Sequence, residues 1–97
     1  MKDKIKLVDR HIQHYLKAKI QIESKIACVH LKPHIVDFYR YVDFTLNQLD
    51  EDSKLIITND FINKNKGYWY LDYYSVSTYY RLRNIAINKF LDCLEGA

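Results

Sequence analysis

From Ser75 onward, apolar and polar residues recur with the period of an α-helix. At 100° per residue, one side collects Tyr79, Leu82, Ala86, Phe90 and Cys93, with Ile87 and Leu94 at its margin. The other side carries Arg81, Asn84 and Asn88, with Thr78 and Tyr80 flanking its N-terminal end. Ser77 and Thr78 are good N-cap residues, so the helix is predicted to begin at one of them.

A second amphipathic pattern covers the first third of the chain. Apolar residues follow three- and four-residue steps with one interruption at Lys19, namely Ile5, Val8, Ile12, Tyr15, Ile22, Ile26 and Val29. Such a helix packs on its own domain or pairs with a second copy, and Pro33 is expected to end it. Residues 1–33 are therefore interpreted as an amphipathic helix for packing or dimerisation, and residues 34–97 as the helix-turn-helix domain.

The middle of the chain predicts shorter helices. One should span 34–49, and Asp50, Asp52 or Ser53 should cap the next, which has apolar positions on more than one side. Gly67 is the expected stop of that helix. Residues 68–74 suit a short helix of about two turns, followed by a tight connection. With only two Gly and one Pro, the chain is expected to be all-α, a small bundle of about five helices with a C-terminal helix-turn-helix.

Charge is modest overall and uneven in its distribution. The net charge is +3, with basic segments near both ends and an acidic stretch around Asp50 to Asp52. Two cysteines and no long apolar run predict a cytoplasmic protein with free thiols and no membrane span. Cys28, His30 and His34 are potential metal ligands, but Pro33 interrupts their helical spacing. No catalytic motif is present, so we expect no enzyme activity, cofactor or metal.

The polar side of the last helix has the chemistry of a major-groove reading helix. Guanidinium, amide and hydroxyl groups recognise base edges, although many surface helices carry such residues without binding DNA. Lys64 and Lys66 stand where a phosphate strand commonly passes, or are simply solvated. The tyrosine and tryptophan side chains of 68–74 are typical of a core that fills the space between short helices, and stacking on unpaired bases is the alternative.

A family resemblance rests on two runs of residues. They are Leu46-x-x-Leu49-Asp-Glu-x-x-x-Leu-Ile-Ile, followed by Phe61, and Ser77-Thr-Tyr-Tyr-Arg-Leu-Arg-x-x-Ala86-x-x-x-Phe90-Leu. The chain from about 40 to 95 resembles the C-terminal helix-turn-helix of phage-type transcription regulators of the ArpU and RinA kind. It is more remotely similar to region 4 of sigma factors, and it resembles small uncharacterised proteins of wall-less bacteria. The resemblance implies sequence-specific DNA binding, with contacts at Thr78, Tyr80, Arg81 and Asn84.

The expected function is therefore double-stranded DNA binding in transcriptional regulation, with helix 77–94 in the major groove. Arg81 and Asn84 are the expected base readers. Residues expected at or near phosphate are Lys64, Lys66, Thr78, Tyr80, Arg83 and Lys89. RNA polymerase and a second copy of the chain, paired through the N-terminal helix, are further candidate partners.

Two alternatives to duplex binding stay open. A helical protein-interaction module without DNA binding is favoured by the apolar residues Ile85 and Leu91, at the edges of the proposed reading face. Single-stranded nucleic-acid binding requires the aromatic rings of 68–74 to be exposed side by side.

Overall fold

The computed structural model describes residues 2–24 and 33–95, and every regular element in them is helical. The elements are α1 (Lys2–Glu23), α2 (Pro33–Gln48), α3 (Glu51–Ile57), the π-helical turn η2 (Thr58–Ile62), the 3-10 helix η3 (Trp69–Asp72) and α4 (Val76–Glu95). The all-α prediction is confirmed. The described chain has four α-helices, fewer than the expected five, because 68–74 forms only a single short 3-10 element.

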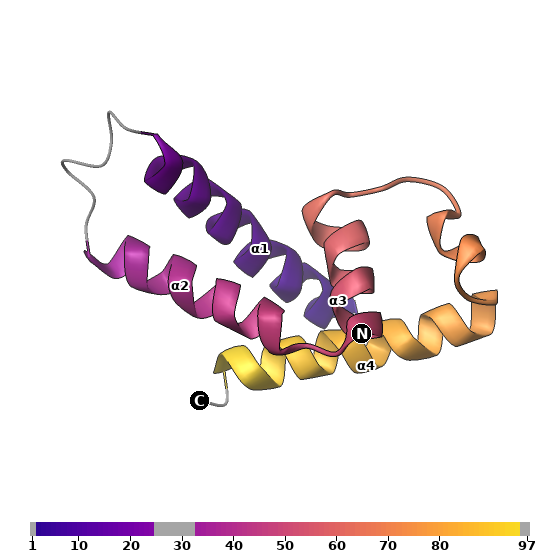
Figure 1. Cartoon of the computed structure of the whole chain (residues 1–97). Helices are drawn as coiled ribbons and strands as arrows, with labels where there is room; N and C mark the ends of the chain where they lie inside the picture. The colour runs from indigo at the N-terminus through magenta and orange to yellow at the C-terminus, as the bar shows by residue number, and fades with distance from the viewer. Residues whose placement is uncertain (1, 25–32, 96–97) are drawn as a thin grey trace.

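The helices build an elongated molecule of 47 × 28 × 23 Å. In Figure 1, α1 and α2 form an antiparallel pair at one end, α3 and η3 lie at the other, and α4 runs beneath both. One hydrophobic core joins the four α-helices, with fully buried Ile12 of α1, Val42 of α2 and Phe90 of α4 among its members. A second, smaller cluster packs η3 through Tyr70 against Ile56 of α3 and Tyr79 of α4. α4 is thus the element on which both ends of the molecule pack.

The first helix packs against its own chain. Its buried residues are Val8, Ile12, Tyr15 and Ala18. Ala18 is buried at the place where the regular spacing put Lys19. A small side chain fits against α2, whereas a lysine there would bring its charged amine into the core. The Tyr15 hydroxyl donates to Asp43 Oδ1 of α2 at 3.0 Å. This contact ties the two helices together within the chain.

The predicted end of the first helix at Pro33 is wrong. α1 ends at Glu23, and Pro33 is instead the first residue of α2, where its missing N–H costs nothing and its fixed φ suits a helix start. Residues 25–32, which include the candidate ligands Cys28 and His30, lie outside the described residues.

One of the three predicted cap candidates caps the next helix. Asp50 is the N-cap of α3, and its Oδ2 accepts the backbone N–H of Ser53 at 3.2 Å. Ile56, Ile57 and Phe61 are buried along α3 and η2. Burial on more than one side is therefore confirmed for this segment.

The helix stops earlier than the predicted Gly67. η2 ends at Ile62, where the Asn63 N–H donates to the Thr58 carbonyl at 2.8 Å, a bond that spans five residues. Lys64 then takes a left-handed φ of 50°, so a lysine occupies the kind of position where a glycine is usual. Gly67 itself has φ 77° and lies in the loop that leads to η3.

The last helix begins earlier than predicted and buries a wider side. α4 starts at Val76, because the Ser75 hydroxyl, not Ser77 or Thr78, accepts the Thr78 N–H at 3.3 Å. Leu91 is buried and Cys93 is exposed, which reverses their expected placement. Helices pack on more than one flank of α4, as the contacts with α1, α2 and α3 show. The buried stripe is therefore shifted from the one that periodicity alone defines.

Candidate nucleic-acid interface

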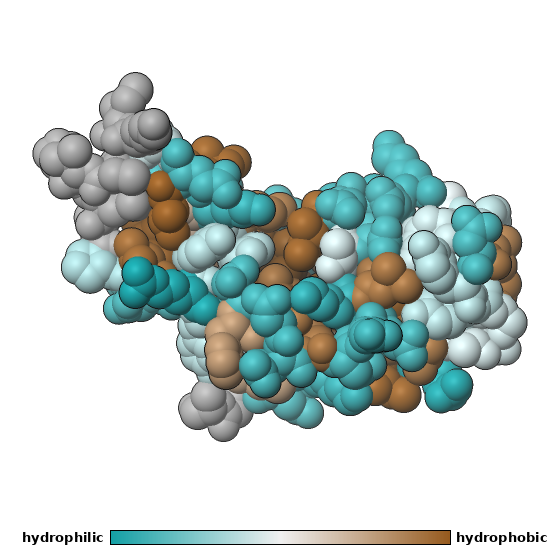
Figure 2. Space-filling model, in the orientation of Figure 1, coloured by the Kyte–Doolittle hydropathy of each residue, from teal (hydrophilic) through white to brown (hydrophobic). Residues whose placement is uncertain are grey.

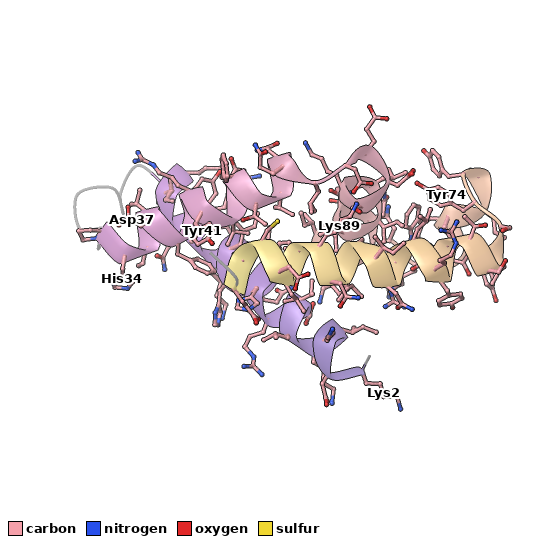
Figure 3. All side chains as sticks on the ribbon, turned by 90° about the horizontal axis from the view of Figure 1, so that it is seen from below. Lys2, His34, Asp37, Tyr41, Tyr74 and Lys89 are labelled. Atoms are coloured by element: carbon pink, nitrogen blue, oxygen red, sulfur yellow. The ribbon has the colours of Figure 1, made fainter. Side chains whose placement is uncertain are left out.

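The outward side of α4 is the surface on which the expected base readers lie. Arg81 and Asn84 are exposed, and within residues 2–24 and 33–95 neither side chain has a hydrogen bond or ion pair. In Figure 3, none of the other helices passes in front of α4. Ile85, between these residues and the C-terminal half, is 38% exposed. The described chain thus leaves a polar helix face open to solvent.

Tyr80 and Thr78 flank this face at its N-terminal end. Tyr80 is 50% exposed, and its ring packs edge-on against Tyr79 at 5.0 Å between centroids. The Thr78 hydroxyl accepts the Ser75 hydroxyl at 2.9 Å and so belongs to the cap. Tyr80 is therefore available to a ligand, while Thr78 also holds the start of the helix.

Two of the lysines expected at phosphate carry ion pairs on the surface. Lys64 Nζ lies 3.2 Å from Asp9 of α1, and Lys89 Nζ lies 2.8 Å from Asp50. All four side chains are about half exposed, so these pairs contribute little stability and can exchange partners. Lys66 is exposed in the loop and has no ion pair among the described residues.

Arg83 has a structural contact. Its Nε lies 3.6 Å from Asp60 Oδ2, and its side chain is only 23% exposed. The pair is too long for a hydrogen bond, and Arg83 Nε has no hydrogen-bond partner within the described residues. This guanidinium therefore faces the interior side of α4, away from the outward face that carries Arg81.

Asp60 is the residue that holds the start of α4 in place, and sequence reasoning did not single it out. Its carboxylate accepts the Trp69 indole N–H at 2.9 Å and the Tyr79 hydroxyl at 2.5 Å, besides the pair with Arg83. One carboxylate of η2 thus joins η3 to the first turns of α4. The only available signal was an isolated acidic residue within an apolar helix, which does not identify its partners.

An aromatic cluster surrounds this carboxylate. Tyr70 and Tyr79 stack with centroids 3.8 Å apart and planes 5° from parallel, and Trp69 meets Tyr79 edge-on at 5.9 Å. Burial, together with the hydrogen bond to Asp60, raises the pKa of Tyr79 well above its usual value. The buried Tyr70 and Tyr79 confirm that part of the aromatic segment is core.

The exposed rings of this segment do not form a stacking platform. Tyr68 and Tyr73 are 72% and 62% exposed, yet Tyr73 is tilted by 59° from Trp69 and by 43° from Tyr74. Parallel stacking in this cluster is confined to Tyr70 and Tyr79, whose rings are buried. Consecutive unpaired bases need several accessible rings with open faces, so this geometry disfavours single-strand binding.

Residues 2–24 and 33–95 contain no group of three or more potential metal ligands, and none of their helices is long and apolar enough to cross a bilayer. Comparison with known protein families, curated proteins and solved structures finds no match.

Proposed function

We propose that this chain is a sequence-specific double-stranded DNA-binding protein of transcriptional regulation, with the N-terminal half of α4 entering the major groove. In this proposal η3, the connection 73–75 and α4 act as a compact helix-turn-helix in which the first helix is reduced to one 3-10 element. Arg81 and Asn84 read base edges, while Tyr80 and Lys66 contact the backbone.

The observation that carries the proposal is the open polar face of α4. Arg81, Asn84 and Asn88 are spaced three and four residues apart, so they share one side of the helix. Arg81 and Asn84 are exposed, while Asn88 is half-buried and accepts a hydrogen bond from Lys4 of α1. From Arg81 to Asn88 the helix advances about 10 Å, which spans about three base pairs. A guanidinium pairs with guanine and a carboxamide with adenine through two hydrogen bonds each. The resemblance to phage-type regulators supports the same assignment.

Rigid support of that face is a second argument. A reading helix must hold its side chains in a fixed register against the bases. The Asp60 carboxylate and the stacked pair of Tyr70 and Tyr79 fix the first two turns of α4 against η2 and η3. Arg81 lies in the second of these turns, and Asn84 follows in the next. Their positions are therefore set by packed structure and not by a loop.

Selection of bound duplexes from a random-sequence pool at near-physiological salt tests the proposal, with Arg81→Ala in parallel. We expect one motif to be enriched by the wild type and lost in the variant. Arg81→Ala should cost about 1 to 3 kcal/mol on the selected site, and Lys66→Ala should weaken all duplexes alike. Absence of enrichment, with weak binding that disappears as salt rises, would refute sequence-specific reading.

A protein-interaction module is the second candidate, and a surface patch at the η3 end favours it. The exposed large residues there are Tyr68, Leu71, Tyr73, Val76 and Tyr80. Figure 2 shows pale and brown atoms gathered at this end of the molecule. Large exposed apolar patches commonly mark protein contacts. However, Leu91, one of the two residues on which this alternative rested, is buried.

The two candidates differ in which substitution matters. A DNA reader depends on Arg81 and tolerates Leu71→Ser, because Leu71 contributes no base-reading group. A protein-interaction module that uses the η3 patch should show the opposite dependence. Capture of proteins from a lysate by wild type, Arg81→Ala and Leu71→Ser, beside the duplex selection, separates them.

A further inference from the structure

The start of α1 lies beside the outward face of α4. Lys4 Nζ donates to Asn88 Oδ1 at 2.6 Å, which joins the first turn of α1 to the middle of α4 across 84 residues of sequence. In Figure 3 the beginning of α1, marked by Lys2, projects past one flank of α4. The N-terminal helix therefore contributes to the surface that surrounds the reading residues.

The two flanks of α4 differ in charge. On the α1 flank, Lys2, Lys4 and Lys6 are all exposed, together with a single exposed acid in the first turn, Asp3. Figure 3 shows Lys89 on the opposite flank, where it pairs with Asp50 at the start of α3. Glu51 and Asp52 follow Asp50 and are exposed as well. A phosphate strand is attracted to the first flank and repelled from the second.

A hollow of about 340 Å³ lies where α1, α4 and the segment around η2 meet. Lys6, Lys64 and Arg83 line it together with Asp9 and Asp60, so three cationic side chains face two carboxylates. Lys64 reaches α1 here through its exposed pair with Asp9. Since such pairs exchange readily, a phosphate oxygen can replace the Asp9 carboxylate as the partner of Lys64.

We propose that the first two turns of α1 form a phosphate-binding flank, in which Lys4 and Lys6 contact the backbone of the DNA strand that borders the groove occupied by α4. This inference rests on the proposed function and specifies which side of α4 the backbone follows. Lys4, held by Asn88, stands next to the base readers, and Lys6 extends the contact to the hollow shared with Lys64. α1 is thereby a part of the DNA-binding unit.

The test is fluorescence anisotropy of a labelled mixed-sequence duplex over a salt series. Lys4→Gln/Lys6→Gln removes both charges, and Lys4→Arg/Lys6→Arg keeps them. Lys17→Gln/Lys54→Gln is the matched control: it removes the same charge from the far half of α1 and from α3, at exposed positions. All variants are compared with the wild-type chain.

Each phosphate contact contributes about 0.9 to the slope of log affinity against log salt concentration. Loss of both contacts should lower that slope by about 2. Between about 50 and 200 mM salt, wild-type binding should then weaken about tenfold more than binding by the glutamine double variant. The arginine variant and the matched control should keep the wild-type slope.

The outcomes separate the two levels of the proposal. If the wild type binds and Lys4→Gln/Lys6→Gln keeps the wild-type salt slope, the phosphate flank is refuted and DNA binding is not. The same holds if the matched control loses as much of the slope as Lys4→Gln/Lys6→Gln does. Failure of the wild type to bind any duplex overturns the proposed function and, with it, the flank.

Discussion

Replacement of Asp60 by alanine should destabilise the protein more than the loss of one surface acid would suggest. The carboxylate is only 13% exposed and accepts hydrogen bonds from Trp69 and Tyr79. Each hydrogen bond to a charged group is worth about 1.5 to 3 kcal/mol. Asp60→Ala leaves both donors without their acceptor and removes the carboxylate that faces the half-buried Arg83. We expect a loss of about 3 to 5 kcal/mol in the free energy of unfolding.

Urea unfolding followed by two signals measures this loss. Far-ultraviolet circular dichroism reports the whole helical fold. Fluorescence of Trp69, the single tryptophan of the chain, reports the aromatic cluster. In Asp60→Ala the fluorescence transition should shift to lower urea at least as far as the dichroism transition, because the lost bonds join η2, η3 and α4.

A double-mutant cycle with Tyr79→Phe tests whether the hydrogen bond is the cause. Tyr79→Phe alone should cost about 1.5 to 3 kcal/mol, and much less when Asp60 is already alanine. A cost below about 1 kcal/mol for Asp60→Ala, or additive costs for the two substitutions, would refute the role given to this carboxylate.

Three further predictions concern the core and two titratable groups. Phe90→Ala should cost about 3 to 5 kcal/mol in a urea melt, since Phe90 is fully buried. Burial and the bond to Asp52 raise the pKa of Tyr74 to about 12. The contribution of Tyr74 to folding stability is therefore complete below its pKa in the unfolded chain, near 10, and is lost as the pH rises toward 12. Urea midpoints measured at alkaline pH should show this loss. The bonds from Lys89 and Ser53 lower the pKa of Asp50 to about 2; acidification from about pH 4 to 2 should therefore destabilise wild type more than Asp50→Asn.

Periodicity in the sequence predicted the helices because each buries an apolar stripe against the others. It located α2 within a residue, since a regular stripe decides its bounds, and it named Asp50 as one of three candidate caps of α3. It misplaced Leu91 and Cys93 because burial on α4 depends on which neighbours cover its flanks. That information lies in tertiary packing and not in the spacing along one helix.

The candidate site likewise contains residues whose positions the sequence predicted and residues whose contacts it could not predict. Exposure of Arg81 and Asn84 follows from their phase on α4, and sequence reasoning placed them on the outward side. The roles of Arg83 and Asp60 depend on the π-helical turn of η2 and on the short η3, and neither element has a distinctive sequence pattern. Pairing of Lys64 with Asp9 joins segments 55 residues apart, which no local rule predicts.

The packing of α1 also limits how two copies of the chain can associate. The residues of its regular seam that would pair between chains include Val8, Ile12 and Tyr15, and these are already buried against α2, η2 and α4. Exposing such side chains costs about 1.5 to 3 kcal/mol each. A homodimer through this seam would therefore compete with the fold of each chain. Dimerisation through the N-terminal helix stays a prediction, and it would need a part of that helix other than these buried residues.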